Sequence, residues 1–409
     1  MNLVEQLLVN KALNVIDRRE AVAEIWGVQP DYGAAEACDV IFSTRDVSVA
    51  SLAAAHLALL PGIRQQKHQV ASDLLSRGDD WAAAAVDLVK FLPRKKIAEI
   101  GGRILEASGQ DWADSLLFEI AKYFPEQLRE FAARVSSPII GEAMLAGGPD
   151  DWVADFVRRF EESDESAFLQ ALVRIRTPAA RAALLSLQAS APERVRPAIE
   201  ACLENCGVTP SPSRRAFFRG SYFGLIAPRA SGRHVVGGRI GGQNPGCEIC
   251  RAEMARVLCL RPDALGWDLR DSPNFFWYQC ACLDRSEAEV FTRVRSDVVE
   301  RLVVIEIAEP RRCECPVFPV ECALVLEESP NQIGIGSDRV PGRGLHDVGG
   351  PPNWCQIDPF PRCPVCRSTM TYLAAIDGGM APFGQIRIRG TLFCFWCDEC
   401  QVAGTRRQR

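Results

Sequence analysis

Eight cysteines in the C-terminal half form two sets with the same spacing. In each set a Cys-x-x-Cys pair is followed, after 29 or 30 residues, by a second close pair. The first set is Cys247, Cys250, Cys280 and Cys282, and the second is Cys363, Cys366, Cys397 and Cys400. Two thiolates on one tight turn bind one ion, and two such turns complete a tetrahedral shell. The spacing therefore predicts two structural Cys₄ sites, for which we expect Zn²⁺, although four thiolates also suit iron.

The residues around each cysteine set repeat as well. A His-x-Val-Gly-Gly run precedes each set, at His234 and at His346, and Cys-Arg-x-x-Met follows the first pair of each. The apolar residues of the next strand have equal offsets: Met254, Val257 and Leu260 match Met370, Leu373 and Ile376. We infer an internal duplication, with copies at about 233–300 and 344–409. Two such units with matching apolar faces are expected to pack about a pseudo-two-fold axis and share one core.

Other uses of cysteine fit less well. The opening residues are charged and lack an apolar leader, so we expect a cytoplasmic location, where the seventeen cysteines stay reduced. A thioredoxin-like pair would stand alone, without a partner pair at a matching distance. We interpret five cysteines as core residues: Cys38, Cys202, Cys206, Cys259 and Cys355. Cys394 aligns with Trp277 and is also placed in the core. The cluster of Cys313, Cys315 and Cys322 receives no assignment.

The elements that position these cysteines belong to the second of two regions, which together predict an α+β multidomain protein. Residues 1–207 are rich in Ala and Leu and show helical periodicity over 46–57 and 179–187. A Gly-x-Asp-Trp-Ala motif at Gly78 recurs at Gly109, so we expect a HEAT-like α-solenoid in which Asp80 and Asp111 cap helices. Residues 208–232 are interpreted as a linker, and 233–409 as the duplicated, zinc-stabilised β domain. Strands are expected over 301–307, 322–326 and 385–388 and in two aromatic segments ending near Cys280 and Cys397.

The second copy resembles the TYPP superfamily, which joins bacterial YwqG-like domains with the programmed cell death protein 2 family. The resemblance covers about residues 217–409 and is carried by a Gly-Gly-x-Pro-x-Trp turn, a Cys-x-x-Cys knuckle and an aromatic strand ending in cysteines. It implies protein handling, as a chaperone, adaptor or immunity protein, rather than catalysis. The turn residues Gly349, Gly350, Pro352 and Trp354 are candidates for contact with a partner, or alternatively for packing with Trp354 as a core anchor.

These features favour a protein-binding protein over the other classes. Four histidines supply little general-base capacity, and the glycine-rich run 237–242 precedes a knuckle rather than a helix, so we do not expect an enzyme. His234 and His346 are interpreted as satisfied loop residues. The alternative is a zinc-ribbon nucleic-acid-binding protein, favoured by basic residues over 214–239 and by the tail 406–409. The net charge of −5 argues against that alternative. No membrane association is expected.

Overall fold

The computed structural model describes most of the 409-residue chain. The described residues are 3–27, 29–135, 137–207, 216–218, 220–227, 232–241, 244–247, 250–280, 289–295, 298–302, 320–334, 346–354, 359–386, 388 and 390–408. Two compact units are present. The first consists of Met1–Cys202, Glu328–Val340 and Met380–Gln385, and the second of Leu203–Glu327, Pro341–Gly379 and Ile386–Arg409. We describe each unit by itself.

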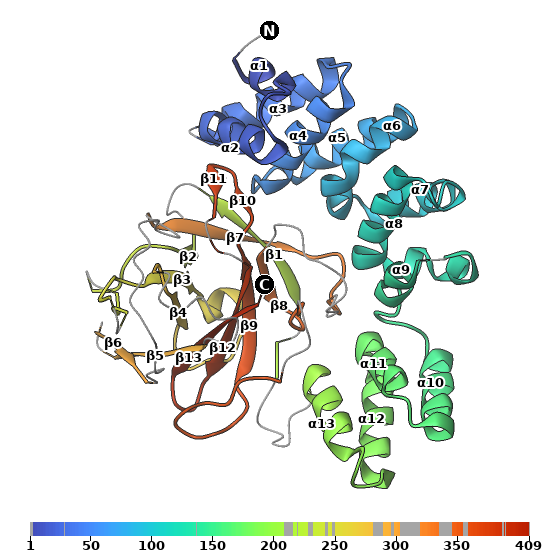
Figure 1. The fold of residues 1–409 in the computed structure, drawn as a ribbon, viewed down its shortest axis with the longest axis vertical. Helices are drawn as coiled ribbons and strands as arrows, with labels where there is room; N and C mark the ends of the chain where they lie inside the picture. Colours follow the sequence, from blue (N-terminus) through green and yellow to red (C-terminus); the bar gives the residue numbers. More distant parts are fainter. Residues whose placement is uncertain are drawn as a thin grey trace. The chain divides into compact units, whose positions relative to one another are not determined.

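The first unit is helical, as residues 1–207 predict (Figure 1). Its elements are α1 (Leu3–Val9), α2 (Val15–Trp26), α3 (Pro30–Ser43), α4 (Val47–Leu59), α5 (Arg64–Ser76), α6 (Asp79–Ala82), η1 (Ala83–Phe91), α7 (Arg94–Glu106), α8 (Asp111–Tyr123), η2 (Pro125–Gln127), η3 (Arg129–Arg134), α9 (Pro138–Ala143), α10 (Asp150–Ser163), α11 (Ser166–Ile175) and α12 (Pro178–Ser190), and α13 (Arg196–Asn205) continues into the second unit. Helices that are close in sequence pack together, as α3 does with α4 and α10 with α11. Short-range packing of this kind buries the apolar face that each helix cannot bury alone.

Side chains cap the N-termini of α4 and α12, but the predicted caps Asp80 and Asp111 are wrong. Asp46 accepts hydrogen bonds from the first turn of α4, and Thr177 does the same for α12. Asp80 and Asp111 are not N-caps, because Gly78 and Gln110 precede α6 and α8 in those positions. At α8 a carboxylate inside the helix, that of Asp114, instead accepts a hydrogen bond from the backbone N of Gly109, at 3.0 Å.

Two segments from the C-terminal half of the sequence belong to the helical unit, which composition does not reveal. The segment Glu328–Val340 brings buried Asn331, whose Nδ2 donates to the backbone O of Lys122 at 2.7 Å. Arg176, at the end of α11, donates to the carbonyl oxygens of Ile333 and Gly334, both at 3.2 Å. The hairpin of β10 (Met380–Ala381) and β11 (Gly384–Gln385) packs against α2. A single cut near residue 207 therefore does not separate the units.

The second unit is built on one antiparallel, eleven-stranded sheet. Its strands are β1 (Ser221–Ala227), β2 (His234–Val236), β3 (Ala255–Cys259), β4 (Asn274–Trp277), β5 (Glu289–Arg295), β6 (Val298–Arg301), β7 (Cys322–Glu328), β8 (His346–Gly349), β9 (Thr371–Asp377), β12 (Thr391–Cys397) and β13 (Val402–Gln408), with the short helix η4 (Pro262–Leu265) after β3. The order is β4-β3-β2-β7-β1-β8-β9-β12-β13-β5-β6. Since β4 also contacts β13 and β5, the sheet curls into a half-barrel.

Eight strands of the sheet are arranged symmetrically about the β7–β1 pair, and β13, β5 and β6 extend the sheet beyond β12. Outward from the β7–β1 pair lie β2, β3 and β4 on one side and β8, β9 and β12 on the other. The strand that precedes each copy pairs with the other copy: β1 pairs with β8, and β7 pairs with β2. The two copies thus exchange their first strands. Neither copy can therefore complete its part of the sheet without a strand from the other copy's side of the sequence.

Local details of the two halves also correspond. The β3–β4 pairing is interrupted between Arg256 and Leu258, so that Val257 is skipped, and the β9–β12 pairing skips Leu373 in the same way. Val257 and Leu373 are the residues that the sequence places at equivalent positions. A shared β-bulge at one position is a feature that related strands retain, because it re-aims the side chains that follow.

Several strand and boundary predictions need correction. β1 lies inside the expected linker 208–232, because its apolar run pairs in the middle of the sheet. Among the described residues of 385–388, Gln385 is in a strand and Ile386 and Ile388 are not. Of 301–307, Arg301 ends β6 and Leu302 follows it, while 303–307 lie outside the described residues, so the strand predicted there stays a prediction. The strands at 322–326 and in the two aromatic segments are confirmed as β7, β4 and β12.

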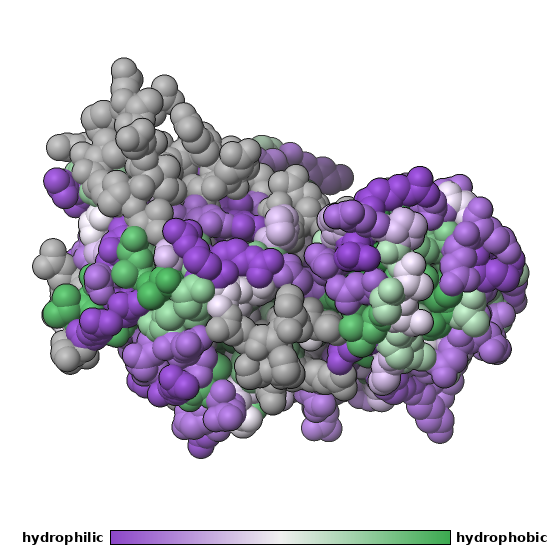
Figure 2. Space-filling view, turned by 90° about the horizontal axis from the view of Figure 1, so that it is seen from below, coloured by the Kyte–Doolittle hydropathy of each residue, from purple (hydrophilic) through white to green (hydrophobic). Residues whose placement is uncertain are grey.

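The face drawn in Figure 2 is mainly hydrophilic, with small apolar areas scattered among polar residues. Exposed large apolar side chains in the described residues include Val298, Val320 and Val365. Scattered residues of this kind are normal and need no partner. In the described part of the chain, every helix is too short or too polar to cross a lipid bilayer.

Candidate metal centres

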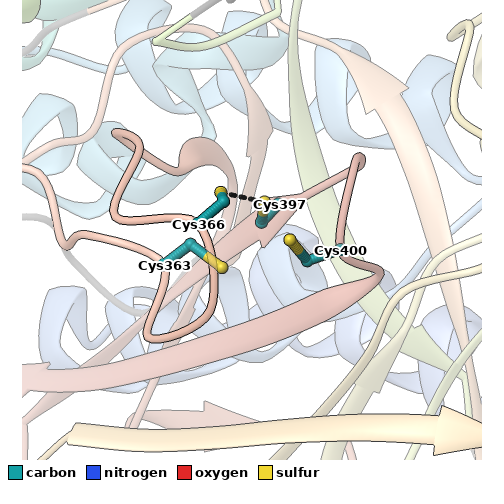
Figure 3. A group of neighbouring side chains, drawn as sticks. All are labelled: Cys363, Cys366, Cys397 and Cys400. Atoms are coloured by element: carbon teal, nitrogen blue, oxygen red, sulfur yellow. Dashed lines mark hydrogen bonds between the residues drawn. The ribbon is translucent and has the colours of Figure 1, made fainter.

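The second cysteine set forms one compact group in the second unit. The four Sγ atoms of Cys363, Cys366, Cys397 and Cys400 all lie within 4.8 Å of one another. Figure 3 shows the first two on the loop that precedes β9, and the other two at the end of β12 and in the turn after it. Cys363 and Cys397 are buried, whereas Cys366 and Cys400 are half-buried. Residues about 30 positions apart thus meet as the spacing predicts.

A tight loop holds the first pair of thiols. The backbone N of Cys363 donates to the O of Ser368 at 2.8 Å, and the N of Arg367 donates back to the O of Cys363 at 2.9 Å. Arg367 has a positive φ of 62°, which an arginine adopts only where the surrounding structure imposes it. The N of Met370 then donates to the O of Pro361 at 2.9 Å and closes the loop before β9 begins. The loop directs both thiols towards one point.

The thiol group fits a tetrahedral ion. With four bonds of about 2.3 Å, neighbouring sulfurs of a Zn–S₄ centre lie about 3.8 Å apart. The Sγ atoms of Cys366 and Cys397 are 3.6 Å apart. Four sulfur donors fill the whole coordination shell, which is the arrangement of structural sites; a catalytic zinc keeps one position for water or substrate. This group is therefore suited to holding the fold together.

The pKa values of the cysteines in this group depend on one another. A hydrogen bond with the Cys397 thiol lowers the pKa of Cys363 to about 5, and the same bond raises the pKa of Cys397 far above its ordinary value. Burial raises the pKa of Cys400 to about 11. The protein alone therefore favours one thiolate surrounded by thiol donors. A divalent ion turns all four groups into thiolates, so its binding releases protons.

The first cysteine set is partly described. The Sγ atoms of Cys247, Cys250 and Cys280 lie within 4.8 Å of one another. The predicted fourth ligand, Cys282, lies outside the described residues. Three thiols at these distances are compatible with a second metal site.

The loop of the first set repeats that of the second. The N of Cys247 donates to the O of Ala252 at 2.8 Å, the N of Arg251 to the O of Cys247 at 2.9 Å, and the N of Met254 to the O of Pro245 at 2.8 Å. Arg251 has a φ of 61°. The same backbone hydrogen bonds and the same left-handed residue thus hold both loops, even though their side chains differ at several positions.

The strand register shows that the predicted alignment of Cys394 with Trp277 is wrong. Trp277 pairs with Ala255 in β3, and Trp396 pairs with Thr371 in β9, so the two tryptophans are equivalent. Cys394 therefore corresponds to Phe275 and not to Trp277. Cys394 is nevertheless fully buried, and burial raises its pKa well above the ordinary value, as for a core residue.

The same register exposes a difference between the sites. The residue after Trp396 is the ligand Cys397, whereas the residue after Trp277 is Tyr278. The hydroxyl of Tyr278 accepts a hydrogen bond from the guanidinium of Arg301. In the first site, the second pair of ligands must therefore lie further along the chain from the tryptophan than in the second site. Sequence spacing alone hides this shift.

The histidines that head the two copies are bound to backbone and are not near the thiols. The Nδ1 of His234 accepts from the N of Arg261, and the Nδ1 of His346 accepts from the N of Asp377, both at 3.1 Å. Burial lowers the pKa of His346 to about 4 and also lowers that of His234. Both histidines are neutral residues that fasten the start of β2 and β8 to a neighbouring segment.

The Gly-Gly-x-Pro-x-Trp turn is buried. Gly349 and Gly350 have φ values of 70° and 67°, and a Cβ on Gly349 would come within 2.2 Å of the O of Gly220. Trp354 is 2% exposed, and its Nε1 donates to the Oδ1 of Asn205 at 3.0 Å. Its ring packs with Phe360, Phe393 and Phe395 in the core beside the second thiol group. Pro352 is buried as well.

Among the described residues, the remaining cysteines lie outside both thiol groups. Cys202, Cys206 and Cys259 are buried, and Cys38 is half-buried. Cys322 is buried in β7, where burial raises its pKa. Cys313, Cys315 and Cys355 lie outside the described residues.

Comparisons of this chain with protein families, with curated proteins and with solved structures find no match.

Proposed function

We propose that this is a non-enzymatic protein-binding protein, acting as a chaperone, adaptor or immunity-like factor, with two structural zinc ions in its β-rich unit. The observation that carries this proposal is the closed four-sulfur group at Cys363, Cys366, Cys397 and Cys400. Four thiolates leave a zinc ion no coordination position for chemistry. The ions would fasten the two knuckles to the ends of β4 and β12. The chemistry of the site then supports a rigid scaffold, and the protein acts through its surfaces.

The helical unit supports the same class of function. Its helices pack chiefly against helices close to them in sequence, which is the arrangement of HEAT-like solenoids. Such arrays present extended surfaces on which protein partners bind. A zinc-stabilised β unit and a helical array in one chain both favour protein binding.

We also propose that residues 217–409 belong to the TYPP superfamily. The buried turn at Gly349 and Gly350, with Trp354 packed beneath it on the aromatic residues of β12, supports this assignment. The matched knuckles, matched bulges and exchanged strands support the duplication on which the assignment depends. The helical unit lies outside the resemblance.

The nucleic-acid alternative loses part of its basis. The tail residues Arg406 and Arg407 belong to β13 and are used within the sheet. The Nε of Arg406 donates to Glu289 at 2.7 Å, while Arg407 is 8% exposed and lies 5.7 Å from the ring of Trp277. Neither is a free cation for a phosphate backbone, which is the dominant contact in nucleic-acid binding.

The proposal is tested by purifying the full chain under reducing conditions from its native cells after mild crosslinking. We expect a protein partner that, once purified, rebinds the zinc-loaded chain at a fixed ratio in size-exclusion chromatography. Chelation of the metal should weaken that binding. Recovery of RNA or DNA instead, seen as absorbance at 260 nm that nuclease removes, would replace protein binding by the nucleic-acid alternative. Substrate turnover by the purified chain would refute the non-enzymatic assignment.

A further inference from the structure

A cavity of about 580 Å³ lies in the second unit, beside the second thiol group. Its size is within the range of about 300–1,000 Å³ that ligand pockets occupy. Three segments line it: the residues after η4, the loop leading into β9, and the turn between Cys397 and Cys400. Phe218 and Trp396 are the aromatic residues of the lining, and both are largely buried, at 6% and 4% exposure. The remainder is mostly polar.

The charged lining of this cavity is anionic. Asp268, Asp398 and Glu399 contribute three carboxylates, against the single guanidinium of Arg270. Asp398 is engaged in holding the walls, because its Oδ1 accepts from the Nε1 of Trp396 at 3.0 Å and from the backbone N of Arg270 at 2.9 Å. Asp268 and Glu399 are both exposed at the cavity. A ligand that enters meets more negative than positive charge.

The first copy shows that the fold does not require this acidic turn. Trp277 is equivalent to Trp396, and the second residue after it is Gln279, where the second copy has Asp398. The first copy builds the same knuckle loop, with the same hydrogen bonds, and ends its aromatic strand without that carboxylate. The carboxylate pair Asp398–Glu399 is therefore a property of the second copy rather than of the knuckle.

We propose that this cavity binds a cationic side chain, arginine or lysine, carried by an extended segment of a protein partner. The inference rests on the proposed protein-binding function and names the chemistry that the partner presents. A guanidinium or ammonium group forms charge-assisted hydrogen bonds with carboxylates. Its aliphatic stem lies along the cavity wall that includes the small exposed parts of Phe218 and Trp396, while the charged end faces Asp268 and Glu399.

The test measures binding of fluorescein-labelled penta-arginine to the zinc-loaded full chain by fluorescence anisotropy, at about 150 mM salt so that distant charges are screened. The pocket variant is Asp268→Asn with Glu399→Gln. The control variant, Asp263→Asn with Glu300→Gln, removes the same charge from exposed positions of the same unit that do not line the cavity. Penta-citrulline serves as an uncharged probe of similar shape. Zinc content and melting temperature are measured for both variants.

We expect the pocket variant to bind penta-arginine at least tenfold more weakly, and the control variant to stay within twofold of the unaltered chain. Penta-citrulline should not bind. Equal weakening by both variants would overturn the proposal, since it means diffuse attraction. If the pocket variant retains a purified protein partner at full affinity, the pocket assignment fails while protein binding stands. If no partner exists at all, the proposed function fails first.

Discussion

Replacing one thiol of the second group tests whether these cysteines stabilise the protein by binding a metal ion or only as buried side chains. Cys366 is the most suitable position, because it is half-buried and its replacement by serine leaves little cavity. A structural zinc site contributes apparent binding free energies of about 10–16 kcal/mol, and a variant that no longer holds the ion loses that contribution. Domains are stable by only about 5–15 kcal/mol. We therefore expect Cys366→Ser, which should lose this ion, to lower the stability of the β-rich unit by an amount comparable with the whole stability of a domain.

The matched control is Cys394→Ala. Cys394 is fully buried in the same strand as Cys397, but it is not a member of the thiol group. Its removal takes away one small buried side chain, for about 1 kcal/mol, and leaves the metal in place. Both variants keep the helical unit unaltered in sequence up to Cys202, so most of the helical circular dichroism should survive.

The assays are metal content by plasma mass spectrometry and thermal unfolding with and without chelator. The unaltered chain and Cys394→Ala should carry two zinc ions, and Cys366→Ser one. Chelator should lower the melting temperature of the first two proteins strongly and that of Cys366→Ser less. The reasoning is refuted if Cys366→Ser retains two ions and unfolds like the unaltered chain, or if Cys394→Ala loses an ion.

Three further predictions concern packing and pH. A Cβ on Gly224 in β1 would lie 2.9 Å from side chains of both neighbouring strands, so Gly224→Val should cost about 1–3 kcal/mol in denaturant unfolding; unchanged stability would contradict the central position of β1. Burial lowers the pKa of His346 from the ordinary value of 6.5 to about 4 in the folded protein. The neutral side chain therefore contributes to folding stability fully above pH 6.5. This contribution, up to about 3 kcal/mol, is lost as the pH falls towards 4. His346→Asn, which keeps an acceptor for the N of Asp377, should flatten the stability curve in that window, and an unchanged slope would assign the loss elsewhere. Asn331→Ala leaves the buried carbonyl of Lys122 without its donor and should destabilise the helical unit by about 1–3 kcal/mol. The control Gln332→Ala, at an exposed position, should change stability by less than about 0.5 kcal/mol. Equal effects of the two variants would contradict the docking of this segment.

The thiol group and the paired knuckles could be predicted from sequence because ligand spacing is a local property. Cys363 and Cys366 are fixed by one loop, and the next pair lies at the end of a strand that pairs directly with the following one. Apolar periodicity also located β3, β9 and β12. The wrong alignment of Cys394 arose because the copies were matched at the second cysteine pair, although Cys280 follows Trp277 by three residues and Cys397 follows Trp396 by one.

The sheet order could not be predicted, because pairing partners depend on contacts between distant residues. Nothing in the composition of 221–227 shows that this strand pairs with β8, which follows 119 positions after its end. The residues near Asn331 likewise give no sign that they belong with helices, since single side-chain-to-backbone hydrogen bonds, such as that from Asn331 to Lys122, leave no periodic pattern in the sequence. The helix caps at Asp80 and Asp111 were misplaced because α6 and α8 begin one residue or more earlier than predicted, and helix boundaries of this kind are the least certain part of a sequence prediction.

The exchange of first strands has a consequence for synthesis. At about 5–20 residues per second, β1 leaves the ribosome roughly 6 to 24 seconds before β8 has been made. Throughout that interval a buried apolar strand has no partner on that side, and a chain stopped before β8 cannot complete the sheet. The first knuckle, whose two loops lie close together in sequence, can assemble and take up its ion during the wait. Metal supply during translation would then decide whether the early half keeps its fold until β8 is made.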